Sequence, residues 1–264
     1  MDRVFDVVLV RPPSNTYEHC ISSNPEKNSI DVQLAKVQHQ SYISILKEND
    51  ITVLELLACE KYPDSVFMQD PALLGLGRSI IGRFGENSRR GEELTLMSEL
   101  NRVQIMKNSR LLHVASPGTL EGGDIMVTDQ QQLFVGLSSR TNSPGIIQLQ
   151  TFLPDTKVTS VRTVSLHLLC GCSYLSDSTV IITPDVVSPQ NFPSLKHITL
   201  DREDAYASDA LYLGNHRVLI PSGFPNASKK LKQAGYVPVE VDVSEFRKGD
   251  GGVTCLCSPI YKTI

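Results

Sequence analysis

The sequence predicts an α/β protein built as a closed ring of about five ββαβ-like units. Four segments repeat one pattern, in which two short apolar runs flank a polar turn. They begin at residues 72, 125, 172 and 210, at spacings of 53, 47 and 38 residues. Segments with helical periodicity lie between them. A supersecondary unit that recurs along the chain in this way indicates a repeat architecture.

Each repeated segment is typical of a β-hairpin, because glycine, asparagine and aspartate supply the turn conformations between the runs. The paired runs are residues 72–76 with 80–81, 125–127 with 133–136, 172–175 with 179–182, and 210–213 with 217–220. Apolar runs at the two chain ends, residues 5–10 and 256–261, predict two more strands. The termini would therefore supply a fifth unit together and close the ring.

The first helix is predicted at residues 30–47, with Ser29 or Asp31 as its N-cap. The residues expected on its apolar face are Ile30, Leu34, Val37, Ser41 and Ile45. The second helix is predicted at residues 92–106. The residues expected on its apolar face are Leu94, Met97, Leu100, Val103 and Met106.

Two shorter helices are predicted at residues 144–153 and 226–234, and Gly235 is the expected C′ glycine of the second. An open doubly wound sheet is the alternative architecture for such a mixture of strands and helices. No Gly-x-Gly-x-x-Gly motif follows the first predicted strand, so a dinucleotide site lacks support. Since no linker or low-complexity run divides the sequence, we expect residues 1–264 to form a single domain.

Composition and charge exclude several classes of partner. Hydrophobic residues make up 41% of the 264 residues and charged residues 20%, which is ordinary for a folded soluble protein. A net charge of −4 and a pI of about 5.9 argue against an electrostatic nucleic-acid binder. The longest apolar stretches, such as residues 7–10, are far below the roughly 20 residues that span a bilayer. The first residues are acidic where a signal peptide is basic, and we expect a cytoplasmic protein without membrane partners.

Six cysteines need an interpretation that suits a reducing compartment. They include two Cys-x-Cys pairs, Cys170 with Cys172 and Cys255 with Cys257, which could supply four thiolates to zinc. Structural zinc sites more often use pairs with two to four residues between them. In a strand, residues i and i+2 face the same side, so packing as small buried side chains is the better interpretation for most of the six.

Polar clusters stand just before several of the predicted hairpins. They are residues 64–70, 120–124, 166–168 and 249–255. In a closed ring of repeats, equivalent positions converge on the axis, where these clusters would bring together carboxylates, one histidine and one cysteine. Carboxylates could hold a cationic substrate, the thiol could attack it, and the histidine could transfer the proton.

The order and content of these motifs resemble the dimethylarginine dimethylaminohydrolases of the pentein, or guanidino-group-modifying, superfamily. The matching segments are residues 64–70, 88–90, 120–124, 134–142, 166–168 and 250–255. The resemblance covers nearly the whole chain. It implies a five-bladed α/β propeller, the pentein fold, which agrees with the ring inferred from the hairpin spacing.

The resemblance also implies roles for individual residues. Cys255 matches the nucleophile, His167 the general acid and base, and Glu121 the carboxylate that orients the histidine. The residues that match substrate-binding positions are Asp64 and Asp70 for the guanidinium head, Phe67 beside the substrate, Arg89 and Arg140 for the α-carboxylate, and the Gly249 carbonyl near the amino-acid end. Guanidinium forks suit a carboxylate because they bind it with two parallel hydrogen bonds.

The implied reaction is hydrolysis of a guanidino C–N bond through a covalent thiouronium on the cysteine, which gives citrulline and an amine from methylated arginine. The resemblance implies neither a metal nor an organic cofactor. The partner would be a small guanidino compound, and a homodimer is compatible with it. Gln69 departs from the family, which usually has glutamate there, so a binding carboxylate is lost. Free arginine or another guanidino compound is therefore an alternative substrate, and a non-catalytic pentein binding module is a second alternative.

Overall fold

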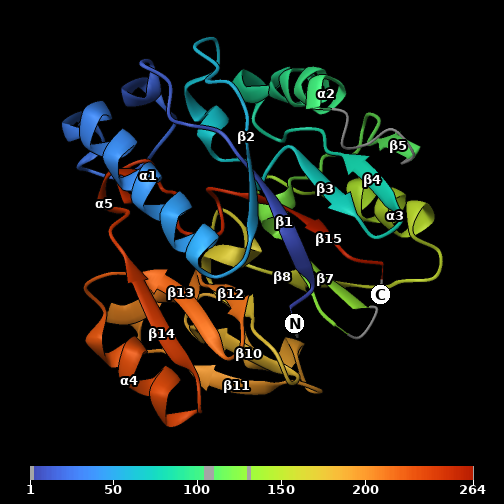
Figure 1. Cartoon of the computed structure of the whole chain (residues 1–264). Helices are drawn as coiled ribbons and strands as arrows, with labels where there is room; N and C mark the ends of the chain where they lie inside the picture. The colour runs from blue at the N-terminus through green and yellow to red at the C-terminus, as the bar shows by residue number, and fades with distance from the viewer. Residues whose placement is uncertain (1–2, 104–109, 130–131, 264) are drawn as a thin grey trace.

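The computed structural model of the chain describes residues 3–103, 110–129 and 132–263. Five units of three strands form its framework (Figure 1). The first unit joins the two chain ends and consists of β15 (Ser258–Tyr261), β1 (Phe5–Val10) and β2 (Thr52–Glu55). The remaining units are β3 (Ala72–Gly75), β4 (Arg78–Ile81) and β5 (Arg110–His113); β6 (Ile125–Val127), β7 (Gln132–Leu137) and β8 (Lys157–Arg162); β9 (Cys172–Tyr174), β10 (Thr179–Ile182) and β11 (Lys196–Thr199); and β12 (Leu211–Gly214), β13 (Arg217–Pro221) and β14 (Val237–Val241).

All five units share one connectivity. The first two strands are antiparallel, and the third strand pairs in parallel with the second. In the second unit, for example, β4 is antiparallel to β3 and parallel to β5. The first unit follows the same pattern, since β1 is antiparallel to β15 and parallel to β2. β15 also pairs in parallel with β3, which merges the first two units into one six-stranded sheet. Gly75 is required at that junction, because a Cβ there would lie 2.0 Å from the Tyr261 carbonyl oxygen.

Helices link the second and third strands of the units, except where the 3-10 turn η7 (Pro189–Asn191) does so in the fourth. They are α1 (Val32–Glu48), α2 (Glu92–Val103), α3 (Ser143–Phe152) and α4 (Pro225–Gln233), and the short α5 (Ser244–Arg247) follows β14. Asp31 caps α1 by accepting hydrogen bonds from the amides of Gln33 and Leu34, so Asp31 rather than Ser29 is the N-cap. Gly235 has a φ of 87° after α4, as expected of a C′ glycine.

The predicted apolar face of the first helix is wrong in part, since Ile30 is buried and Ile45 packs against the core, but its middle is exposed. Leu34 and Val37 are 40% and 62% exposed, and Ser41 is exposed as well. The residues that α1 buries are Ala35, Gln38, His39, Tyr42, Ile43 and Leu46. Two of these contacts are polar: the Gln38 side chain bonds to α5, and the Tyr42 hydroxyl donates to the Val253 carbonyl at 2.9 Å. The hydrophobic pattern of the sequence does not predict the buried face of α1, because hydrogen bonds of polar side chains help to determine which face is buried.

The predicted face of the second helix is wrong in part. Leu94 is 63% exposed, whereas Leu96 and Leu100 are each 1% exposed. Three-residue intervals drift around a helix of 3.6 residues per turn, and the pair that is four residues apart keeps to the core. Met106 lies outside the described residues.

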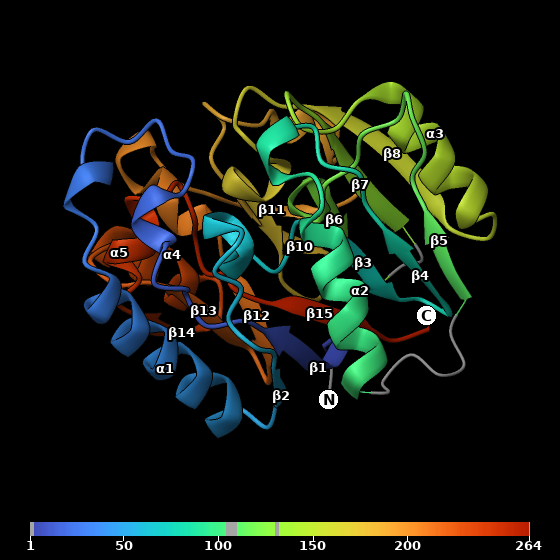
Figure 2. The same cartoon turned by 90° about the horizontal axis from the view of Figure 1, so that it is seen from above.

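Figure 2 shows the arrangement of the strands from above. Hydrophobic clusters between neighbouring units close the ring. One cluster joins β1, β3 and α2 between the first and second units, and others join the second to the third, the third to the fourth and the fourth to the fifth. The largest cluster packs Val8 and Val10 of β1 against Leu211 and Leu219 of the fifth unit. The predicted five-bladed α/β propeller is confirmed. Its organisation as one domain over residues 1–264 stays a prediction.

The described residues also show the state of the cysteines and the character of the helices. All six cysteines are free thiols, and Cys59 and Cys170 alone among them are not fully buried. In the described part of the chain, no helix combines the length and the apolar character needed to cross a membrane.

Candidate active site

Each unit contributes to the candidate site through the segment that leads into its first strand. In four units this segment is a 3-10 turn, η3 (Pro63–Val66), η5 (Gly122–Asp124), η6 (Leu168–Cys170) or η8 (Arg202–Ser208), and in the first unit it is residues 248–257 before β15. Consecutive turns touch, since η5 contacts η6 and η6 contacts η8. The chemically active side chains at or beside these segments are Asp70, Glu121, His167, Asp209 and Cys255.

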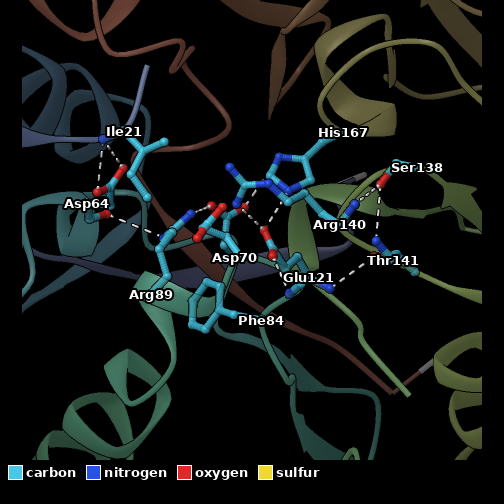
Figure 3. A network of polar contacts seen from close by, with 12 residues as sticks. Ile21, Asp64, Asp70, Phe84, Arg89, Glu121, Ser138, Arg140, Thr141 and His167 are labelled. Carbon is cyan, nitrogen blue, oxygen red and sulfur yellow. Dashed lines mark hydrogen bonds and ion pairs between the residues drawn. The ribbon is translucent and has the colours of Figure 1, made fainter. Parts of the chain in front are cut away.

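His167 lies between two carboxylates (Figure 3). Its Nε2 is 2.8 Å from Oε2 of Glu121, which orients the ring, and its Nδ1 is 3.7 Å from Oδ1 of Asp70. Burial would lower the pKa of His167, but the Asp70 charge and the hydrogen bond to Glu121 raise that pKa well above its ordinary value. The ring is therefore held as a cation that can give up a proton from Nδ1.

One carboxylate oxygen in this cluster lacks a hydrogen-bond partner among the described residues. Oδ1 of Asp70 is buried and unpartnered, beside Nδ1 of His167. Gly123 makes room here, because a Cβ would lie 2.7 Å from that oxygen and 2.8 Å from Nδ1. A buried carboxylate oxygen without a partner is costly, so the position is suited to a ligand N–H donor.

Two arginines neutralise the acids of this cluster. Arg89 donates to Oδ2 of Asp70 at 2.6 Å and to both oxygens of Glu92 at 3.0 and 2.9 Å. Arg140 donates to Oε2 of Glu121 at 3.2 Å. The structure thus places both guanidinium groups against acids of the site, and their predicted contact with a substrate carboxylate stays a prediction.

Cys255 stands in the segment before β15 and is 7% exposed. Its carbonyl accepts a hydrogen bond from the Gln69 amide at 3.2 Å, which ties the loop of the predicted nucleophile to the Asp70 segment. Its Sγ is 3.7 Å from Oδ2 of Asp209. Burial and then the Asp209 charge raise the pKa of the Cys255 thiol well above its ordinary value. Deprotonation at neutral pH therefore requires a positive charge nearby.

Three further residues that match substrate-binding positions, Asp64, Phe67 and Gly249, gather under the segment that precedes α1. Both oxygens of Asp64 accept from the Ile21 amide, at 3.1 and 3.2 Å. Phe67 is buried and lies edge-on to Tyr17 at 6.0 Å between ring centroids. Gly249 packs so closely that a Cβ would lie 2.6 Å from the Tyr17 hydroxyl and 3.3 Å from Phe67. Asp64 thus positions the covering segment, and its predicted contact with the guanidinium is untested.

Gln69 faces away from this constellation. Its Nε2 donates to the Gly122 carbonyl at 3.3 Å, and the side chain lines an interior cavity of about 50 Å³ together with Phe5 and Tyr261. The amide therefore fits a structural position that requires a donor.

Asp70, Glu121 and His167 also form a set that could bind a metal, since their ligand atoms lie within 4.8 Å of one another. Oε2 of Glu121 already accepts from His167 and Arg140, and Oδ2 of Asp70 accepts from Arg89. With these oxygens bonded to cations of the protein, the set favours acid–base chemistry over metal ligation.

Asp209 and Glu92 are functional candidates that the sequence motifs missed. Asp209 stands two residues before β12, as Asp70 stands two residues before β3. Asp209 could therefore have been identified by looking for a polar residue just before every predicted hairpin. Glu92 had no such signal, because the first residue of an amphipathic helix is often acidic.

Comparison with known proteins assigns the chain to a family. The family model described as "N,N dimethylarginine dimethylhydrolase, eukaryotic" matches residues 11–262. The N(G),N(G)-dimethylarginine dimethylaminohydrolase of Pseudomonas aeruginosa is 34% identical over 257 residues, which are 96% of this chain and 98% of that protein. An uncharacterised protein of Aeropyrum pernix is 38% identical over 269 residues, covering 100% of this chain and 98% of its own.

Solved structures agree with the sequence comparison. A cysteine-to-serine mutant of the Pseudomonas aeruginosa enzyme, complexed with citrulline, superposes with a TM-score of 0.88 at 32% identity over 97% of this chain and 100% of the other. The N-terminal domain of the cyanobacterial arginine dihydrolase ArgZ has a TM-score of 0.87 at 21% identity over 98% of this chain and 99% of the other, which shows the shared fold. The chain belongs to the dimethylarginine dimethylaminohydrolase family, a family of hydrolases.

Proposed function

We propose that this chain hydrolyses the guanidino C–N bond of N-ω-methylated arginine to citrulline and methylamine or dimethylamine. The observation that carries the proposal is the buried, unpartnered Oδ1 of Asp70 next to a cationic His167, in a segment that bonds to the Cys255 carbonyl through the Gln69 backbone amide. A guanidinium ion supplies the N–H donor that this oxygen lacks and a positive charge that favours the Cys255 thiolate. The names of the relatives support the same substrate class.

Thiolate formation would begin the reaction. A guanidinium carbon is a weak electrophile because resonance spreads its charge, so the site must fix it beside a strong nucleophile. Asp70 would hold the cation, whose charge favours loss of the proton from Sγ of Cys255. The thiolate would then add to the guanidinium carbon and form a C–S bond.

His167 would serve both halves of the reaction. Because Nε2 is bonded to Glu121, Nδ1 is the nitrogen available to protonate the departing amine as the C–N bond breaks. This leaves a thiouronium on Cys255 and a neutral His167. The ring would next remove a proton from water, which attacks the same carbon and releases the ureido product and the thiolate.

Hydrolysis of free arginine is the second candidate, favoured by Gln69, whose amide faces Gly122 and leaves the site without the acid that the family usually has there. A non-catalytic binding module is the third. Arg89 and Arg140 favour amino acids over agmatine, which has no carboxylate.

A citrulline-release assay on arginine, N-monomethylarginine, asymmetric dimethylarginine and agmatine tests these candidates, with the departing amine identified by mass spectrometry. Release of methylamine or dimethylamine at a higher kcat/KM than ammonia from arginine is expected. Exclusive ammonia release would establish the second candidate instead. No ureido product from any of the four would leave the binding module.

A further inference from the structure

Asp209 is a buried carboxylate that the proposed reaction does not yet use. It is 3% exposed, and Oδ1 accepts from the Thr254 amide at 2.8 Å, while Oδ2 lies 3.7 Å from Sγ of Cys255. The Gly252 backbone passes so close that a Cβ there would lie 2.1 Å from Oδ2. The orientation of this carboxylate toward the nucleophile is therefore fixed from two sides.

Asp209 differs from Asp70 and Glu121 in having no cationic partner. Asp70 and Glu121 each bond to an arginine, whereas Asp209 forms no ion pair within 4.0 Å in the described part of the chain. Arg247 lines the same pocket of about 410 Å³ but stacks on the Tyr206 ring at 4.9 Å. A buried carboxylate without a counter-charge is costly, and the pocket in front of it can admit one.

Both acids belong to segments that touch the loop of the nucleophile, since the backbone amide of Gln69, next to Asp70, bonds to the Cys255 carbonyl and Oδ2 of Asp209 lies 3.7 Å from Sγ. Both Asp70 and Asp209 are close enough to raise the pKa of Cys255. A guanidinium ion is planar and carries N–H donors along its edges, so it can bond two carboxylates while its carbon faces a thiol. Gln69, at the position where the family usually has the second acid, points into the interior cavity.

We propose that Asp209 is the second guanidinium-binding carboxylate of this enzyme and that it accepts a hydrogen bond from the departing nitrogen, so that it selects substrates whose departing nitrogen carries an N–H. Monomethylarginine and arginine have an N–H on each terminal nitrogen. Asymmetric dimethylarginine has none on its dimethylated nitrogen, and its two methyl groups would leave Oδ2 of Asp209 unpaired in a buried site. A site built to bond an N–H rejects an analogue that lacks it far more strongly than an apolar pocket does.

The inference rests on the proposed function, and the experiment separates the two. The kcat/KM ratio of N-monomethylarginine to asymmetric dimethylarginine is measured for the wild type, Asp209→Asn and Asp204→Asn. We expect the wild type to favour the monomethyl substrate by roughly a hundredfold and Asp209→Asn to reduce that ratio at least about tenfold. Asp204 is buried in η8, the turn that Asp209 follows, and it has no hydrogen bond to Cys255 in the described part of the chain, so Asp204→Asn should keep the wild-type ratio.

A ratio that changes less than about twofold in Asp209→Asn overturns the inference and leaves the proposed function standing. If the wild type turns over neither substrate, the proposed function fails, and calorimetric titration of Cys255→Ser and of Cys255→Ser with Asp209→Asn decides the inference. Tighter binding of monomethyl- than of dimethylarginine, lost in the double variant, supports it. Equal affinities, or no binding to either protein, overturns it.

Discussion

The two flanks of Cys255 are organised differently. On one flank, the carboxylates of Asp70 and Glu121 are already bonded to Arg89 and Arg140 of the protein itself. On the other flank, Asp209 is held by a backbone amide and has no cation within 4.0 Å among the described residues. The first flank is paired with protein cations except at Oδ1 of Asp70, which awaits a ligand N–H, whereas the second has no ion pair in the described part of the chain.

This difference separates positioning from attraction. Groups that the protein has already paired cost little reorganisation when a substrate arrives, so they suit the orientation of His167 and of the guanidinium edge. A carboxylate that burial has left charged and unpaired gains most from the incoming cation. The chemistry should therefore fail when the first flank is broken, and substrate selection should change when the second is.

Replacing Cys255 should have the largest effect. Cys255→Ser should lower kcat by at least about four orders of magnitude, because a serine hydroxyl is a far poorer nucleophile toward a guanidinium carbon. Cys257→Ser is the matched control: Cys257 is fully buried, and its pKa is raised to about 12 by burial, so it should keep substantial activity. Citrulline release and thermal unfolding check both variants. The reverse outcome would mean that the terminal motif is aligned two residues out of register.

Removing the imidazole should have the next largest effect. His167→Gly should slow both formation and breakdown of the covalent adduct by roughly 10²- to 10⁴-fold, because one ring protonates the amine and later activates water. Rapid quenching followed by intact-protein mass spectrometry measures the two steps separately. If both rates match those of the wild type, His167 has no part in proton transfer.

The architecture could be predicted from the sequence because each unit has its own local pattern of apolar runs and turn residues. The apolar runs around residues 125–136 and 172–182 alternate with turns of the right chemistry, and they form hairpins where expected. The buried faces of α1 and α2 could not be predicted from the sequence. Gln38 is buried because it bonds across to α5, a partner more than 200 residues away in sequence, and no local pattern contains that information.

Only those residues of the candidate site that stand in recognisable sequence motifs could be predicted. Asp70, Glu121 and His167 stand in polar clusters that a reader of the sequence notices, and the fold brings them together. Asp209 lies between Ser208 and an apolar strand, where an acid reads as an ordinary turn residue. Its contact with Cys255 depends on the convergence of two units whose residues are 46 positions apart.

The pH dependence of the unpaired flank is the third prediction. Burial raises the pKa of Asp209 to about 6, against the hydrogen bonds of the Thr254 backbone and side chain. The titratable groups that influence it or are influenced by it are Tyr42, His167, Tyr206, Cys255 and Cys257, and Cys170, Arg247 and Asp250 line the same pocket. Protonation removes the charge that binds the cation, so kcat/KM should fall about tenfold per unit as the pH drops below about 6. Asp209→Asn should lack this limb of the profile, and a limb that persists would assign it to another group.

The same carboxylate should lower the stability of the fold at neutral pH. Because its pKa is raised above that of the unfolded chain, the folded state holds the proton more tightly. The stabilisation is therefore present at low pH and is lost as the pH rises through about 6. Asp209→Asn should be more stable than the wild type at pH 8, by on the order of 2 kcal/mol, and nearly equal to it at pH 4. Thermal melts at both pH values measure this, and a variant that is less stable at pH 8 would show that the charge is compensated.

Restoring the family's acid should have the smallest effect. Gln69→Glu replaces a donor that bonds the Gly122 carbonyl with a carboxylate that repels it, so we expect a loss of about 1–3 kcal/mol in unfolding free energy. Because this side chain faces the interior cavity rather than Cys255, the ratio of asymmetric dimethylarginine to arginine turnover should shift by only about two- to fivefold. Parallel kcat/KM measurements on Gln69→Glu and Asp209→Asn compare the two positions directly. A larger shift in Gln69→Glu would mean that a glutamate at residue 69 turns toward the substrate and that selection belongs to the first flank after all.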